Sequence, residues 1–138
     1  MKTIKGNLIM KKDMIFNGDL KVEGNILGKN GNIFNLRVNG NLNCRNLNCR
    51  NLTCRNLDCW NLNCWNLTCF DLNCGNLDCW DLDCVNLDCR NLEFYAIAIA
   101  YYSFKCKSWK ATRKKFIIKC LDGEIEGKEL SGEKDDNN

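Results

Sequence analysis

A leucine stands at every fifth residue from Leu42 to Leu92, and this period constrains the fold more than any other feature. A cysteine follows each leucine by two residues, from Cys44 to Cys89. A helix has 3.6 residues per turn, so leucines five apart would spiral around it instead of lining one face. Repetition at a fixed short period is instead typical of a solenoid, and a helical assignment is excluded.

Residues two apart on an extended chain point to the same side, so Leu57 and Cys59 both face inward while Asp58 faces outward. The outward position between leucine and cysteine is polar in every unit: Asn43, Asn48, Thr53, Asp58, Asn63, Thr68, Asn73, Asp78, Asp83 and Asp88. The residue before each leucine is Asn or Asp, which tolerates the left-handed backbone of a tight corner. Each pentapeptide is therefore predicted to be a short strand and a corner, and successive coils are predicted to stack as parallel strands.

The segment Asn41 to Phe94 resembles the pentapeptide-repeat family in its consecutive Leu-x-Cys units. This resemblance implies an all-β, right-handed quadrilateral β-helix with about four pentapeptides per coil. Outward residues twenty apart would then share a column, with Trp60 above or below Trp80. Residues 1–40, with apolar pairs separated by glycines, also resemble bactofilin-like β-helices. Gly18, Gly24 and Gly40 are expected to form positive-φ corners there.

We predict a single β-helix domain over residues 1–130. Its parts are irregular N-terminal coils (1–40), regular pentapeptide coils (41–104) and a basic C-terminal cap (105–130). Residues 131–138 are expected to form a disordered acidic tail. Beyond Leu92 the inward positions are predicted to be Phe94, Ile97, Ile99, Tyr102 and Phe104.

Twelve cysteines and no histidine are present. One interpretation of the evenly spaced cysteines is that they fill a narrow interior as small apolar groups. The alternative interpretation is that they form a metal or cluster site. Ladders of stacked thiols do not converge on one point, so no metal and no cofactor are expected. The N-terminal residues lack a signal-peptide pattern, so reduced thiols in a bacterial or phage-infected cytoplasm are expected. The longest apolar run, 95–102, is too short to span a bilayer, so no membrane insertion is expected.

Large aromatic side chains fall at outward positions of the repeat, although a bare β-helix does not need them there. The predicted partner-binding residues are Trp60, Trp65, Phe70 and Trp80. Exposed aromatic clusters mark contact surfaces, which here would serve a second copy of the chain, as in a homodimer, the chain's own C-terminal segment, or a foreign protein.

The formal net charge is +3, and the positive charges concentrate after the regular repeat. The predicted anion-binding or nucleic-acid-binding residues are Lys105, Lys107, Lys110, Arg113, Lys114 and Lys115. Such a run attracts anionic partners, nucleic acid included. The alternative is a solvated face that the acidic residues after Leu121 partly neutralise.

Three serines, no histidine and no glycine-rich phosphate loop give catalysis little support, so neither an enzyme nor a small-molecule substrate is expected. Our leading hypothesis is a rigid protein-interaction module. The family resemblance implies docking onto nucleic-acid enzymes, so the module could inhibit a nucleic-acid-processing or host-defence complex, as a phage protein would. The alternatives are a self-assembling structural protein and a nucleic-acid-binding protein that uses the basic segment.

Overall fold

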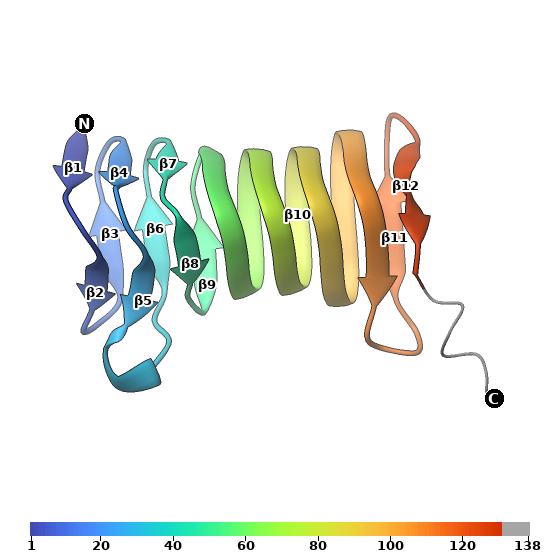
Figure 1. Cartoon of the computed structure of the whole chain (residues 1–138). Helices are drawn as coiled ribbons and strands as arrows, with labels where there is room; N and C mark the ends of the chain where they lie inside the picture. The colour runs from blue at the N-terminus through green and yellow to red at the C-terminus, as the bar shows by residue number, and fades with distance from the viewer. Residues whose placement is uncertain (131–138) are drawn as a thin grey trace.

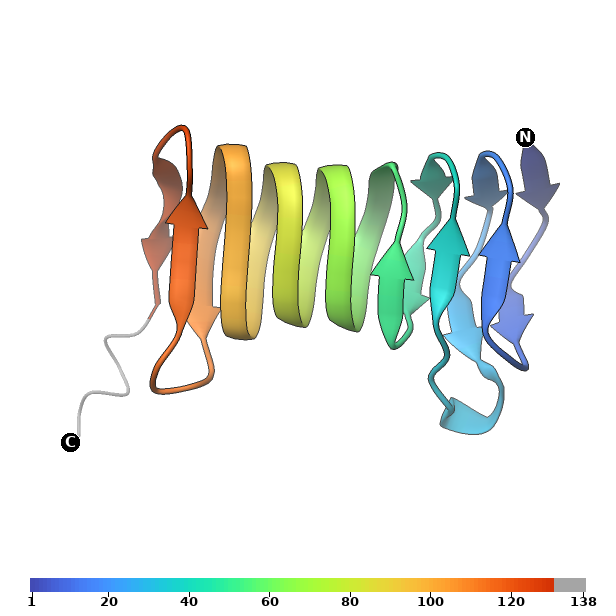
Figure 2. The same ribbon diagram turned by 180° about the vertical axis from the view of Figure 1, so that it is seen from behind.

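The computed structural model describes residues 1–130, and the predicted tail at 131–138 lies outside them. The chain forms an all-β, right-handed parallel β-solenoid of about seven turns (Figures 1 and 2). The elements are β1 (Lys2–Ile4), β2 (Leu8–Met10), β3 (Met14–Phe16), β4 (Leu20–Val22), β5 (Ile26–Gly28), η1 (Lys29–Gly31), β6 (Leu36–Val38), β7 (Leu42–Asn43), β8 (Asn46–Asn48), β9 (Asn51–Thr53), β10 (Asn56–Ala111), β11 (Ile117–Cys120) and β12 (Ile125–Glu129).

Each coil has three strands, so the solenoid has three faces. The β1 face stacks β1, β4 and β7 in parallel, the β2 face stacks β2, β5 and β8, and the β3 face stacks β3, β6 and β9. The long strand β10 then winds through all three faces in turn and pairs with β7, β8 and β9 (Figure 1).

The expectation of four pentapeptides per coil is wrong, because the register in the regular region is 15 residues. Leu57 pairs with Leu42, and Leu67 pairs with Leu52. A coil therefore holds three pentapeptides. The five-residue period sets the length of a side but not the number of sides, which depends on how sharply each corner bends. In the N-terminal coils the spacing is wider, from 18 residues between Lys2 and Leu20 to 22 between Leu20 and Leu42.

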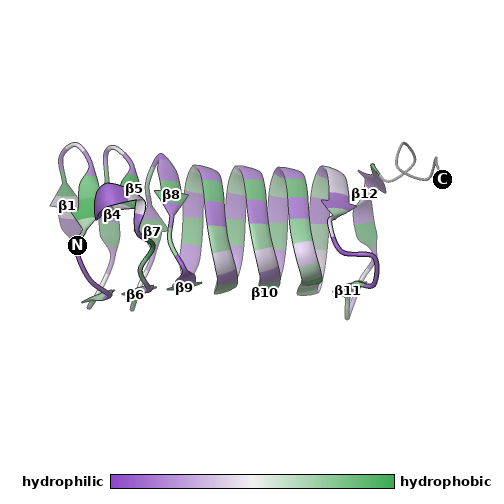
Figure 3. Cartoon of the chain, turned by 90° about the horizontal axis from the view of Figure 1, so that it is seen from below, coloured by the Kyte–Doolittle hydropathy of each residue, from purple (hydrophilic) through white to green (hydrophobic). Residues whose placement is uncertain are grey.

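The core confirms the inward assignment of leucine and cysteine. Every leucine from Leu42 to Leu92 and every cysteine from Cys44 to Cys89 is buried, and no polar or charged residue is buried within residues 1–130. The alternation is visible as hydrophobic and hydrophilic bands along the ribbon in Figure 3. Because each inward side chain is covered by the coils above and below, the coils stabilise one another rather than folding one by one.

The corners of the regular region do not use left-handed backbone, contrary to the sequence expectation. Among residues 1–130 the positive-φ residues are Asn30 and four glycines, of which only Gly18 is one of the three predicted. Gly24 and Gly40 serve a different purpose, because a β-carbon there would lie 2.3 Å and 2.5 Å from side-chain oxygens of Asn7 and Asp19. These two glycines allow close approach between coils instead of an unusual φ.

The corner asparagines form ladders of side-chain hydrogen bonds. On the β2 face the Nδ2 group of each asparagine donates to the Oδ1 atom of the residue one coil before, and Ser108 ends the series. This ladder comprises Asn25, Asn46, Asn61, Asn76, Asn91 and Ser108. An amide can donate on one side and accept on the other, which explains why asparagine recurs at this position.

The regular spacing ends after Phe94, so some inward positions predicted beyond it are wrong. Phe94 and Phe104 are buried as predicted, but Ile97 and Ile99 are half-buried and Tyr102 is 63% exposed. Ala98 and Ala100 point inward instead. The cause is a lengthened coil, since the Ser103 and Ser108 hydroxyls donate to Asn86 and Asn91, 17 residues earlier rather than 15.

Aromatic side chains fill the C-terminal end of the core. Phe94 and Trp109 lie 6.1 Å apart between ring centroids, and Phe116 meets both in edge-on contacts at 5.8 and 5.9 Å. Beyond this cluster, β11 pairs with residues 97–100 and β12 pairs with the end of β10. Phe94 takes the cysteine position of the β2 face, two residues after Leu92, and the bulky rings fill the wider last coil.

Replacing Leu62 with Asp is expected to abolish folding, whereas Asn63→Asp should change the free energy of unfolding by less than about 0.5 kcal/mol. Leu62 is buried between coils, where a carboxylate finds no partner and its burial costs several kcal/mol, while Asn63 is exposed. Circular dichroism and urea denaturation of both variants measure the difference. Equal tolerance at the two positions would contradict the inward assignment.

Asp81→Asn is expected to stabilise the protein by about 1 kcal/mol. Asn66 donates to Asn51 in the ladder of the β3 face, and Asp81 stands one coil later, where an ionised carboxylate cannot donate to Asn66. The Oδ1 atom of Asp81 is buried without a hydrogen-bond partner. Urea denaturation tests the gain against Asp83→Asn, an exposed position on the same strand, which should leave stability unchanged.

Candidate interaction surface

The residue after each cysteine lies at a corner, and the three corners carry three different columns. The corner after the β2 face, here called the stacked corner, carries Arg50, Trp65, Trp80 and Tyr95. The corner after the β3 face carries Arg55, Phe70 and Val85. The corner after the β1 face, here called the Gly75 corner, carries Arg45, Trp60, Gly75, Arg90 and Lys107.

The side chains of the stacked corner form one continuous stack along the solenoid. The indole rings of Trp65 and Trp80 lie 4.5 Å apart at an interplanar angle of 4°, and Tyr95 follows Trp80 at 6.0 Å. The guanidinium of Arg50 lies 5.1 Å from the Trp65 ring at one end, and that of Arg113 lies 5.9 Å from Tyr95 at the other. Ring–ring and cation–π contacts fix these exposed side chains in place.

The four predicted aromatic residues do not form one patch. Trp65 and Trp80 share the stacked corner, while Trp60 and Phe70 lie on the other two corners. The expected pairing of Trp60 with Trp80 is therefore wrong, because residues one coil apart are 15 positions apart and Trp80 stacks on Trp65. Trp60 instead packs against the guanidinium of Arg45, 4.7 Å from its ring centroid.

The predicted basic residues are spread around the last coils rather than gathered on one surface. Lys105 lies on the β1 face and Lys107 at the corner that follows it, Lys110 lies on the β2 face, and Arg113 joins the stacked corner. Lys114 and Lys115 are exposed in the bend that follows β10. Each stretch of the surface thus receives only part of the positive charge.

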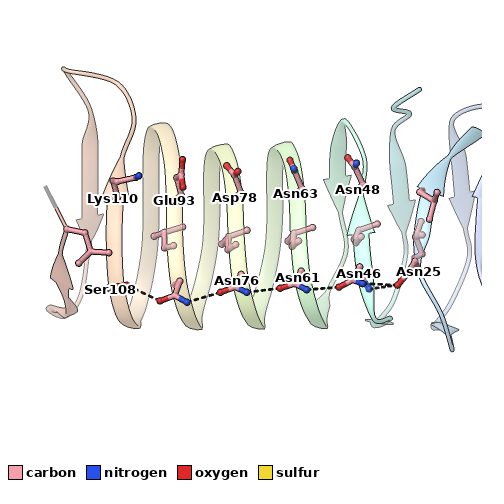
Figure 4. Close-up of a pocket in the computed structure, with 18 residues that line it drawn as sticks. Asn25, Asn46, Asn48, Asn61, Asn63, Asn76, Asp78, Glu93, Ser108 and Lys110 are labelled. Carbon is pink, nitrogen blue, oxygen red and sulfur yellow. Dashed lines mark hydrogen bonds between the residues drawn. The ribbon is translucent and has the colours of Figure 1, made fainter. Parts of the chain in front are cut away.

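A shallow groove runs along the β2 face between two columns of side chains, as Figure 4 shows. The asparagine ladder lines one side. The other side carries Asn48, Asn63, Asp78, Glu93 and Lys110. Burial, together with the neighbouring Glu93 carboxylate, raises the pKa of Asp78. The amides of the ladder are already paired with one another, so the groove offers its free polar groups along the second column.

The cysteines form ladders of their own inside the solenoid, and all twelve thiols are free. Thiols in successive coils contact one another, as Cys74 contacts Cys59 and Cys89. Burial raises the pKa of Cys49 and of Cys84 to about 12, so both are neutral at physiological pH. No group of three or more Cys, Asp or Glu side chains in residues 1–130 is arranged to hold a metal ion.

The stability of the fold is expected to fall as the pH rises from about 9 to about 12. Below the ordinary thiol pKa of 9.0, Cys49 and Cys84 are protonated whether the chain is folded or unfolded. Above it the unfolded chain loses these protons first, so ionisation favours unfolding. Thermal unfolding at a series of pH values measures the effect. Cys84→Ala should weaken this pH dependence, and a melting temperature constant up to pH 11 would contradict the prediction.

Arg50 and Tyr95 belong to the stacked corner but are not among the residues predicted from the sequence. The signal was present, because Trp65, Trp80 and Tyr95 are spaced by 15 residues, which is three pentapeptides. The role of Arg113 in the stack had no such signal, since the last coil is irregular and its residues reach Tyr95 only through the folded loop.

Comparison with known protein families, curated proteins and solved structures finds no match to this chain. Within residues 1–130, no helix is long and apolar enough to cross a membrane.

Proposed function

We propose that the protein is a non-catalytic interaction module, a rigid rod that binds a protein partner along its stacked corner. The observation that carries this proposal is the exposed stack of Arg50, Trp65, Trp80, Tyr95 and Arg113. Inward leucines and cysteines supply the core, so the fold does not require aromatic rings outside it.

The stack suits binding because it is already ordered. Each ring is held by its neighbours at a spacing set by the coils, so little side-chain entropy is lost when a partner covers it. Tryptophan, tyrosine and arginine are also the residues that most often dominate binding energy at interfaces. Trp80 and Tyr95 are 47% and 46% exposed. Trp65 covers one ring face of Trp80, whereas the ring of Tyr95 is tilted by 47° to that of Trp80, so a partner meets the indole edges and the tilted ring of Tyr95.

The charges next to the stack define the kind of partner that fits. Arg50 and Arg113 stand at its two ends, while Asp78 and Glu93 lie beside it on the β2 face. A complementary protein surface has an apolar strip with acidic groups at its ends and a basic group at one side. The resemblance to pentapeptide-repeat proteins makes a nucleic-acid-processing or host-defence complex the first class of partner to test, with the module acting as an inhibitor.

A second candidate function is end-to-end self-assembly, which the first coil favours. Strands β1, β2 and β3 each pair with a strand on one side only, so their other edges are unpaired. Ile4, Leu8, Met14 and Phe16 are only partly buried at this end. Unpaired edges beside apolar groups are templates for strand addition by another chain.

Replacing both Trp65 and Trp80 with Ser is expected to keep the fold and abolish partner binding. The stack contributes roughly 1 kcal/mol per pair to stability, far less than the core. The test is an affinity pulldown from host lysate with the wild type, the double variant and a Phe70→Ser control. Circular dichroism checks the fold of each bait.

Sedimentation of the same three proteins separates the two candidate functions. The interaction module is supported if the protein sediments as a discrete species and the pulldown loses the partner only with the double variant. Long assemblies that persist in the double variant support self-assembly through the first coil. A partner captured equally by all three baits would refute the stacked corner as the binding site.

A further inference from the structure

The Gly75 corner has the features of a second ligand site. It is separate from the stacked corner, and it does not rest on the function proposed for the stacked corner. Arg45, Trp60, Gly75 and Arg90 occupy this corner in four successive coils. Trp60 has one ring face against Arg45 and is 61% exposed. Its other face points along the solenoid toward Gly75, which has no side chain to cover it.

The gap at Gly75 is one aromatic ring thick. Parallel coils lie about 4.8 Å apart, so Trp60 and Arg90, two coils apart, are separated by roughly 10 Å. Rings one coil apart do stack in this protein, as Trp65 and Trp80 show at 4.5 Å. One planar ring between Trp60 and Arg90 would therefore contact the indole on one face and the guanidinium on the other. The hollow is lined by both residues and by Lys107.

The backbone keeps this gap open. A β-carbon at Gly75 would lie 2.8 Å from the carbonyl oxygen of Trp60, closer than β-carbons pack in proteins. A larger side chain at this position would thus strain the corner as well as fill it. Glycine is the one residue that fits the close approach of the two coils without strain.

The polar groups at the rim indicate the chemistry of the ring. Asp58, Asn73 and Asp88 project from the β1 face beside Trp60, Gly75 and Arg90, and they line the hollow. Within residues 1–130 none of the three side chains takes part in a hydrogen bond or an ion pair. Carboxylate and amide oxygens accept hydrogen bonds from ring N–H and exocyclic amino groups.

The cations of the corner indicate that the ring carries a negative group. Arg45 lies against one face of Trp60, and Arg90 and Lys107 follow Gly75 on the other side, which disfavours a cationic ligand on the Trp60 face and favours a phosphate near Arg90 and Lys107. A planar, amino-bearing heterocycle linked to a phosphate has all of these properties.

We propose that the Gly75 corner binds a nucleobase with its attached phosphate. The base stacks between the Trp60 indole and the Arg90 guanidinium, its edge meets Asn73 and the flanking carboxylates, and its phosphate meets Lys107. The same chemistry is found in a free nucleotide and in single-stranded nucleic acid, where base–aromatic stacking is a main source of affinity.

Isothermal titration calorimetry of the full chain tests the site with the four nucleoside monophosphates and with a single-stranded octanucleotide. Trp60→Ala should weaken binding about tenfold or more, since stacking on an aromatic ring is worth roughly 1–3 kcal/mol per base. Trp60→Phe should restore most of it. Phe70→Ala, at an exposed corner without a gap, is the matched control and should bind as the wild type does. Circular dichroism confirms the fold of each variant.

The probes distinguish the two sources of the ligand. If the wild type binds the monophosphates and Trp60→Ala does not, the site is assigned to free nucleotides. If the wild type binds only the octanucleotide and Trp60→Ala does not, the site is assigned to a single strand. Lys107→Gln should reduce affinity for a monophosphate more than for its nucleoside, because Lys107 is the residue that meets the phosphate. The proposal is overturned if no probe binds at millimolar concentration, if Trp60→Ala retains full affinity, or if Phe70→Ala loses as much.

Discussion

Parallel stacking of successive coils is the constraint on which every other feature of this structure depends. The backbone of one coil bonds to the next, as Leu57 on Leu42 and Leu67 on Leu52 illustrate, and this fixes a single vertical spacing for the whole molecule. Asparagine ladders, thiol ladders and the aromatic stack all repeat at that spacing because their side chains are attached to the same rungs. A side chain is therefore placed by two coordinates, its position in the pentapeptide and its coil.

Much of the fold could be predicted from the sequence because the inward positions obey a strict rule. Leucine and cysteine two residues apart can share one side only on an extended chain, and all of them from Leu42 to Cys89 are buried. The number of strands per coil could not be obtained in this way. It depends on the bend at each corner, and the residues there, a variable residue followed by asparagine or aspartate, are compatible with both three and four sides.

The candidate sites were harder to predict, since they depend on which residues lie one coil apart. Four sides per coil would place Trp60 in the column of Trp80, whereas Trp80 stacks on Trp65. With three sides, the importance of Gly75 becomes visible as the missing ring between Trp60 and Arg90. The switch from Ile97 and Ile99 to Ala98 and Ala100 as inward residues had no local signal, because it follows from the longer coil that accommodates Phe94, Phe104 and Trp109.

The 15-residue register also governs how such a chain can change its length during evolution. Duplicating or deleting one full coil between Leu42 and Leu87 would return each later residue to the same corner, so the columns would continue with one member more or fewer. Duplicating a single pentapeptide would keep the leucines and cysteines inside but rotate the downstream part by one corner. If the duplication fell between Trp80 and Arg90, Tyr95 would leave the line of Trp80, and Arg90 would leave that of Trp60. Growth by whole coils preserves the surface, whereas growth by single repeats preserves only the interior.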